Sequence, residues 1–86
     1  DLQYQSRAYA ALNRRLLHHR AQAEVYVRLG STVAAIEQLE LGLKSGEGDY
    51  YQLSATESRL RELRRQDAEE RKSQGRRDNK PLASNT

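Results

Sequence analysis

The sequence predicts an all-α protein built from antiparallel helical hairpins. Its long proline-free stretches are rich in Ala, Leu, Gln, Glu and Arg, which favour helix, and β-branched residues never alternate with polar ones over a strand's length. Short connections between consecutive helices make them antiparallel neighbours. We therefore expect four helices, and the expected breaks fall at Asn13, Gly30, Gly46, Gly48 and Gly75.

The first two helices are expected over about residues 2–12 and 14–29. Asn13 is expected to end the first, because asparagine tolerates the left-handed conformation that often closes a helix. In the second, Glu24 and Arg28 are spaced for an ion pair one turn apart. Its expected apolar face consists of Leu16, Ala23 and Val27, widened by Tyr26.

The third helix is expected over about residues 32–44, between two glycine-containing turns. Gly30 is expected to close the helix before it, and Ser31 to cap its start. Glu40 and Lys44 are spaced for a surface ion pair. Its expected apolar positions are Val33, Ile36, Leu39 and Leu43.

The fourth helix is expected to start after Asp49, a capping residue followed three positions later by Gln52. It is expected to run to about Ser73, with Asp67 and Arg71 paired on its surface. Beyond Leu63 it contributes no large apolar residue to a core. Its expected buried face consists of Tyr50, Leu53, Leu60 and Leu63.

Length and charge predict one small domain over residues 1–72 and a disordered basic tail over residues 73–86. Residues 64–86 carry seven basic and four acidic side chains, so 7 − 4 accounts for the whole net charge of +3. The chain has no cysteine, and no apolar run approaches the roughly 20 residues that span a bilayer. Asp1 in place of Met indicates a processed or excised segment.

The residues from His19 to Gly48 match the spacing of one helical repeat unit. Small residues at three positions would let two helices approach closely, an aromatic would fill the gap between hairpins, and a glycine would make the turn. This pattern resembles one tetratricopeptide unit, although His19 stands where a large residue is usual and the closing proline is absent. The repeat-packing positions are Ala23, Tyr26, Gly30, Ala35, Leu39 and Gly42.

Three longer runs carry a more specific resemblance. They are Ala21–Tyr26, Ala35–Glu40 and Gly46–Gln52, and they are followed by the ending Glu57–Leu63. Over residues 4–65 the chain resembles the C-terminal repeat domain of bacterial periplasmic zinc metalloproteases of the BepA type. The resemblance implies a periplasmic domain that docks substrates or partners in outer-membrane protein quality control. It also implies that the zinc site and catalytic domain lie outside these residues, and that this catalytic domain is one possible partner.

The residues themselves indicate a non-catalytic segment with no cofactor or metal site. His18 and His19 are adjacent on a helix and point about 100° apart, so they cannot chelate one ion as an i,i+4 pair does. Glu37 and Glu40 share a helical face, but a solvated surface explains them better than an acid–base pair does. No glycine-rich phosphate loop is present.

The expected partner is a protein or peptide. Tetratricopeptide arrays bind along a groove lined by the first helix of each hairpin, and the resemblance places five residues there: Leu17, Arg20, Glu24, Val27 and Arg28. The same residues could instead face neighbouring repeats, and an exposed repeat end could self-associate.

Two other functions stay open from the residues alone. One is a stand-alone helical-repeat adaptor, which could be cytoplasmic. The other is a small basic protein that binds nucleic acid through residues 64–80, although this tail lacks aromatic side chains and acidic residues interrupt its basic run.

Overall fold

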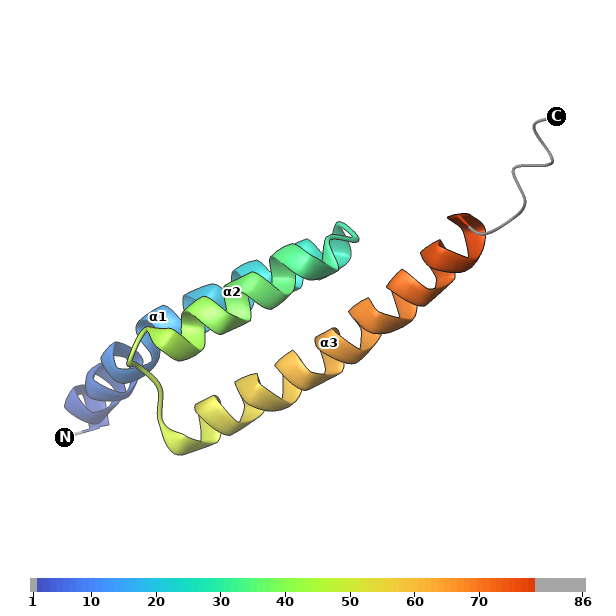
Figure 1. Ribbon diagram of the computed structural model, residues 1–86. Coiled ribbons are helices and arrows are strands. Elements are labelled where there is room, and N and C mark those ends of the chain that lie inside the picture. Colours follow the sequence, from blue (N-terminus) through green and yellow to red (C-terminus); the bar gives the residue numbers. More distant parts are fainter. Residues whose placement is uncertain (1, 79–86) are drawn as a thin grey trace, which may run out of the picture.

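The computed structural model describes residues 2–78, with the side chains of residue 7 and of residues 10–75. It consists of three helices: α1 (Leu2–Arg28), α2 (Thr32–Lys44) and α3 (Tyr50–Asp78). The helices α1 and α2 form an antiparallel hairpin, and α3 runs beside α2 in the opposite direction to it (Figure 1). The all-α prediction is confirmed, whereas the prediction of four helices is wrong within this part of the chain.

The prediction of four helices, rather than three, depended on a break at Asn13 between the first two. Helix α1 instead continues through this residue. No described residue other than glycine has a positive φ. The buried carboxamide of Asn13 instead meets the start of α3. Its Oδ1 accepts the backbone N–H of Asp49 at 3.0 Å, and its Nδ2 donates to Asp49 Oδ2 at 3.3 Å. The distant partner satisfies this side chain, so no local turn is needed.

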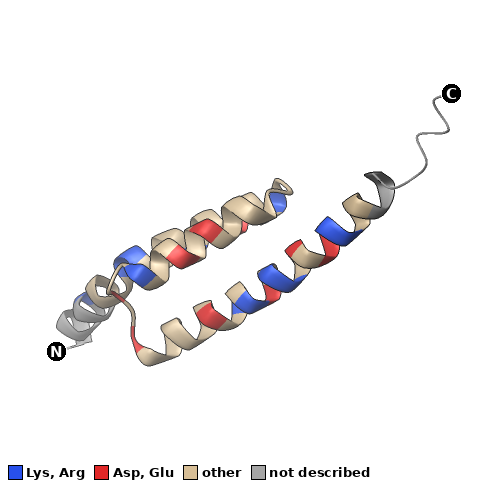
Figure 2. Cartoon of the chain, viewed as in Figure 1, with Lys and Arg blue, Asp and Glu red and all other residues tan. Residues whose placement is uncertain are grey.

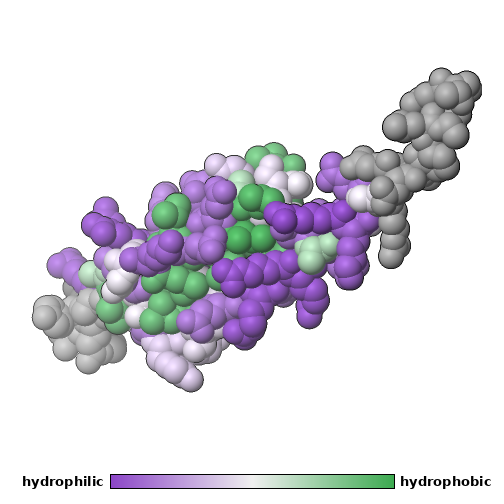
Figure 3. Space-filling view, viewed as in Figure 1, coloured by the Kyte–Doolittle hydropathy of each residue, from purple (hydrophilic) through white to green (hydrophobic). Residues whose placement is uncertain are grey.

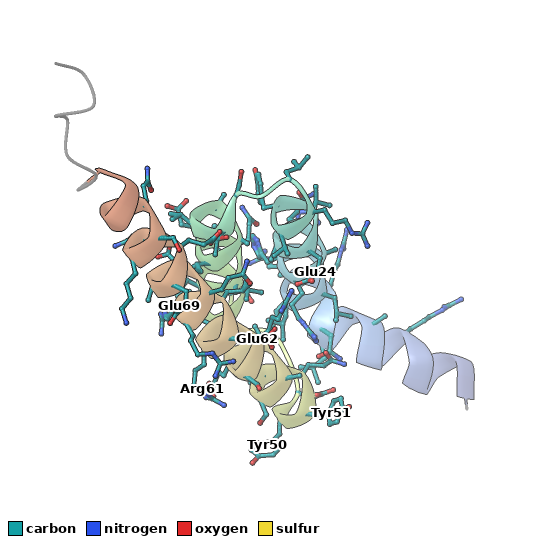
Figure 4. The ribbon with its side chains drawn as sticks, turned by 90° about the vertical axis from the view of Figure 1, so that its right-hand side faces the viewer. Glu24, Tyr50, Tyr51, Arg61, Glu62 and Glu69 are labelled. Atoms are coloured by element: carbon teal, nitrogen blue, oxygen red, sulfur yellow. The ribbon has the colours of Figure 1, made fainter. Side chains whose placement is uncertain are left out.

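The connection from α2 to α3 also bonds to the backbone of α1. The carbonyl of Leu12 accepts the N–H of Gly48 at 2.7 Å, and the N–H of Arg15 donates to the Glu47 carboxylate at 2.6 Å. When a side chain accepts a backbone N–H of a helix, it competes with the helix's own i→i−4 hydrogen bond, and such competition bends helices. Figure 4 shows α1 changing direction along its length, with its N-terminal part running away from α2 and α3.

The hairpin turn is closed by Gly30, which has a φ of +80°. The N–H of Ser31 donates to the carbonyl of Tyr26 at 2.8 Å, and that of Gly30 donates to the carbonyl of Val27 at 3.0 Å. These two bonds form the Schellman arrangement that ends many helices. Ser31 occupies the N-cap position of α2, as the sequence predicts, but its side chain makes no capping hydrogen bond.

Small residues bring α1 and α2 close together. A Cβ atom placed on Gly42 would lie 3.2 Å from His19 Cβ and 3.2 Å from Leu16 Cδ1. Ala23 of α1 and Ala35 of α2 are also fully buried. The core therefore depends on close approach of two backbones as well as on large side chains. The buried apolar residues are Leu16, Ala23, Ala35, Leu39, Leu60 and Leu63.

Helix α3 begins as the sequence predicts, since Asp49 Oδ1 accepts the N–H of Gln52 at 2.8 Å. Its buried face differs from the expected one. Tyr50 is 86% exposed, while Thr56 is fully buried and donates its hydroxyl to the carbonyl of Gln52 at 2.7 Å. Tyr50 is the first residue of α3, and the rotation that buries Thr56 and Leu60 turns it outward. Val33 of α2 is likewise 48% exposed, against expectation.

The end of α3 also differs from the expected one. The helix continues past Gly75 to Asp78, so the tail predicted from residue 73 begins inside it. Residues 79–86 lie outside the described part. Figure 3 shows hydrophobic residues gathered in the middle of one face of the molecule, where α2 and α3 lie side by side, with hydrophilic residues around them.

A groove between the first and third helices

Three of the five binding residues predicted on α1 face α3 across a groove of about 500 Å³. One wall belongs to α1, the other to α3, and Leu39 of α2 lies at the floor. The groove forms because both outer helices pack on α2 and make few contacts with each other. Its lining residues are Leu17, Arg20, Ala21, Glu24, Leu39, Gln52 and Arg59.

An ion pair joins the two walls. Arg59 Nε donates to Glu24 Oε2 at 3.0 Å, and its Nη2 donates to Glu24 Oε1 at 2.9 Å. Arg59 Nη1 also pairs with Glu62 Oε1 at 2.6 Å. The hydrogen bonds to Glu24 raise the pKa of Arg59, against the opposing effect of burial. In Figure 4 Glu24 lies between α1 and α3, close to Glu62.

A second link crosses the groove one helical turn away along α1. Arg20 of α1 donates through Nη1 to the side-chain oxygen Oε1 of Gln52 on α3. This partner is neutral, and among the described residues Arg20 takes part in no ion pair. Its positive charge is therefore not balanced by a carboxylate, unlike that of Arg59. Next to it Leu17 is 39% exposed, so the groove offers an apolar side chain beside a cation.

Three of the five expected groove residues line this space: Leu17, Arg20 and Glu24. Val27 instead packs against the buried core, and Arg28 is exposed in the last turn of α1. The residues of the opposite wall were not predicted from the sequence. Gln52 and Arg59 are seven residues apart and so share a face of α3, but only the rotation of α3 turns that face toward α1.

The repeat-packing residues lie mostly in the hairpin. Ala23, Ala35 and Leu39 are at most 1% exposed, and α1 and α2 approach closely at Gly42. Tyr26 is partly buried against the same core. Gly30 lies in the exposed turn.

The ion pairs show how tertiary contacts displace local ones. Glu24 was expected to pair with Arg28, but it pairs with Arg59. Glu40 was expected to pair with Lys44, but it bonds Arg64 of α3 at 3.1 Å. Asp67 and Arg71, which both belong to α3, form the expected i,i+4 pair at 3.2 Å.

The two histidines lie at different depths. His19 is half-buried, and its Nδ1 lies 2.9 Å from Gln38 Oε1 across the hairpin, whereas His18 is exposed. Glu37 is also exposed. Within residues 2–78 no three His, Cys, Asp or Glu side chains gather where they could hold a metal ion. In the same region no helix has the length and apolar character needed to cross a membrane.

Comparison with protein-family models, with curated proteins and with solved structures found no match to this chain. The resemblance to periplasmic metalloproteases therefore stays a prediction from the sequence.

Proposed function

We propose that this chain is a non-catalytic protein-interaction module that binds a peptide segment of another protein in the groove between α1 and α3. The observation that carries the proposal is the groove itself, about 500 Å³ in volume and lined by apolar and charged side chains from three helices. Such a mixture suits polypeptide, because apolar side chains provide contact area while a few charges fix orientation.

The arrangement of the helices supports a repeat of the tetratricopeptide type. In that reading α1 and α2 are one hairpin, and α3 is the first helix of the next. The close approach at Gly42 and the burial of Ala23 and Ala35 fit the small positions of such a unit. The chain then holds one and a half hairpins, and its groove is the part of a concave surface that two successive first helices line.

The groove favours a peptide with an acidic side chain next to an apolar one. Arg20 bonds only a neutral amide among the partners described for it, so a ligand carboxylate would gain a charge-assisted hydrogen bond there. Leu17 and Ala21 lie one turn apart beside it and would contact the apolar side chain. Arg59 is already held by Glu24 and Glu62 and is the weaker anion site.

The larger context rests on the sequence resemblance alone. If the chain is the repeat domain of a BepA-like periplasmic zinc metalloprotease, the groove would dock substrates or partners during outer-membrane protein quality control. Zinc would then belong to the catalytic domain, and the module would need no cofactor.

The proposal is tested by selecting peptides from a displayed random library on the immobilised protein and mapping them by amide chemical shifts. Enriched peptides should pair an acidic with an apolar residue and perturb residues 17–24 and 52–59. Leu17→Glu and Arg20→Gln should each weaken binding about tenfold or more, because each removes a groove contact.

Val25→Ser is the matched control, since Val25 lies on α1 outside the groove and is 46% exposed. It should leave peptide affinity unchanged. No enrichment, or peptides whose binding depends on Val25 and not on Leu17 and Arg20, would reject the groove as the binding site.

A further inference from the structure

The side of α1 that faces away from α2 and α3 carries a second surface with helix-pairing spacing. Six residues at intervals of four and three lie along this side and therefore share one face of the helix. All six are exposed, so no described element covers them. We call this set the open seam, and it consists of Ala11, Arg15, His18, Gln22, Val25 and Leu29.

The open seam changes character along its length. At its N-terminal end the exposed Arg14, Arg15 and His18 surround a hollow of about 630 Å³, which Glu47 also lines. At its C-terminal end Val25 is 46% exposed and Leu29 is 71% exposed. The two ends are about 20 Å apart at 1.5 Å per helical residue.

The basic end keeps a net positive charge. Within the described residues, neither Arg14 nor Arg15 takes part in an ion pair. The carboxylate of Glu47 is bonded to the backbone N–H of Arg15, and it is one negative charge against two guanidinium groups. By contrast, basic and acidic residues alternate along α3, where Arg64 and Arg71 are both paired (Figure 2).

We propose that the open seam docks an amphipathic helix of a partner protein, with acidic residues opposite Arg14 and Arg15 and aliphatic residues opposite Val25 and Leu29. Residues at these intervals form a continuous row along α1, against which a second helix can pack. The charge of one end and the apolar character of the other fix the direction in which the partner helix lies.

The middle of the open seam is polar. Gln22 is exposed between the basic end and the apolar end, and its side-chain amide can both donate and accept hydrogen bonds. A polar residue at a helix-pairing position specifies the register of two helices at some cost in stability. The partner helix is therefore expected to place an uncharged polar residue opposite Gln22, and to bind more weakly than a fully apolar seam would allow.

A helix fits these observations better than nucleic acid does. The phosphate backbone has no apolar group for Val25 and Leu29, and the open seam has no Phe, Tyr or Trp side chain to stack on a base. The carboxylate-bearing residue Glu47 also lies beside the basic end. A single acidic polypeptide can lie along the basic end and avoid Glu47, whereas a duplex would bring a second row of phosphates toward its carboxylate.

This surface is independent of the groove. No seam residue lines the groove, so each surface can fail or succeed without the other.

The test uses a labelled synthetic amphipathic helix of about 20 residues, with glutamates in one half, leucines at coiled-coil positions in the other and one glutamine between them. Binding is measured by fluorescence anisotropy at low and moderate salt. The double variant Arg14→Gln/Arg15→Gln should weaken binding about tenfold and flatten its salt dependence. The double variant Val25→Ser/Leu29→Ser should weaken it similarly but keep the salt dependence, because it removes apolar contact and no charge.

The matched control is Arg61→Gln/Arg65→Gln, which removes two exposed arginines from α3 and should leave the affinity unchanged. Leu17→Glu in the groove should also have no effect. Circular dichroism checks that each variant stays helical, which is expected because all the changed side chains are exposed.

Four results would overturn the proposal. A version of the peptide with lysines in place of glutamates could bind as well, or the α3 control could lose as much affinity as the seam variant. Duplex DNA could bind more tightly than the peptide with the same dependence on Arg14 and Arg15, which would assign the surface to nucleic acid. Sedimentation could show a dimer that Val25→Ser/Leu29→Ser dissociates, which would assign it to a second copy of the chain.

Discussion

The hairpin of α1 and α2 and the long helix α3 are held by different kinds of contact. Inside the hairpin two backbones approach closely at Gly42, and fully buried Leu16, Ala23 and Ala35 fill the space between them. Helix α3 adds Leu60 and Leu63 to the core, but many of its links to the hairpin are polar. These links are Asn13–Asp49, Arg20–Gln52, Arg59–Glu24, Thr32–Glu70 and Arg64–Glu40.

This difference separates a fixed part of the groove from an adjustable one. Close packing is sensitive to changes as small as a methyl group, so the hairpin has one well-defined geometry. The two ion pairs among these links, Arg59–Glu24 and Arg64–Glu40, join partly exposed side chains and cost little to break and remake, because water replaces them. We therefore infer that α1 and the floor at Leu39 are preformed, and that α3 is the wall that adjusts to a ligand.

The largest expected effect is in the hairpin. Leu16→Ala should lower the free energy of unfolding by about 2–5 kcal/mol, because it leaves a cavity at a fully buried position. Urea denaturation followed by circular dichroism measures the change. Leu41→Ala, at a position 49% exposed on α2, is the matched control and should cost under about 1 kcal/mol. Equal losses for the two variants would contradict the close packing inferred for the hairpin.

An intermediate effect is expected where the hairpin meets the start of α3. Asn13→Ala removes the acceptor of the Asp49 N–H at a buried site and should cost about 1–2 kcal/mol. Alanine's better helix propensity offsets about 0.5 kcal/mol of this. The same denaturation experiment on Gln22→Ala, an exposed polar position of α1, should show no loss. A neutral or stabilising Asn13→Ala would mean that the contact with Asp49 does not hold α3.

The smallest expected effect is at the ion pair across the groove. Glu24 and Arg59 are partly exposed, so a double-mutant cycle with Glu24→Gln and Arg59→Gln should give a coupling of about 0.5–1 kcal/mol. The coupling should shrink at about 1 M salt, because added ions screen partly exposed charges. A coupling above about 3 kcal/mol that salt leaves unchanged would show a rigid link and would contradict an adjustable wall.

Local sequence patterns predicted the hairpin better than the placement of α3. Gly30 and the span of α2 follow from turn chemistry and helix propensity, which act within a few residues. Asn13 was wrongly predicted to end a helix, because its side chain has a partner 36 residues away that no local rule detects.

The missed side of the groove has the same cause. The rotation of α3 decides that Gln52 and Arg59 face α1, that Thr56 is buried and that Tyr50 is exposed. In Figure 4 Tyr50 and Tyr51 point outward from the first turn of α3. That rotation is set by several weak contacts at once, including the pairs that Glu24 and Glu40 form with α3 in place of their neighbours on α1 and α2.

Native-state hydrogen exchange tests the contrast between hairpin and α3 most directly. It gives the opening free energy of each backbone amide, and local openings appear as values below that of global unfolding. We predict larger opening free energies for residues 35–43 of α2 than for residues 64–72 of α3, and a further decrease in α3 alone at about 1 M salt. Equal opening free energies in α2 and α3, unchanged by salt, would contradict the account.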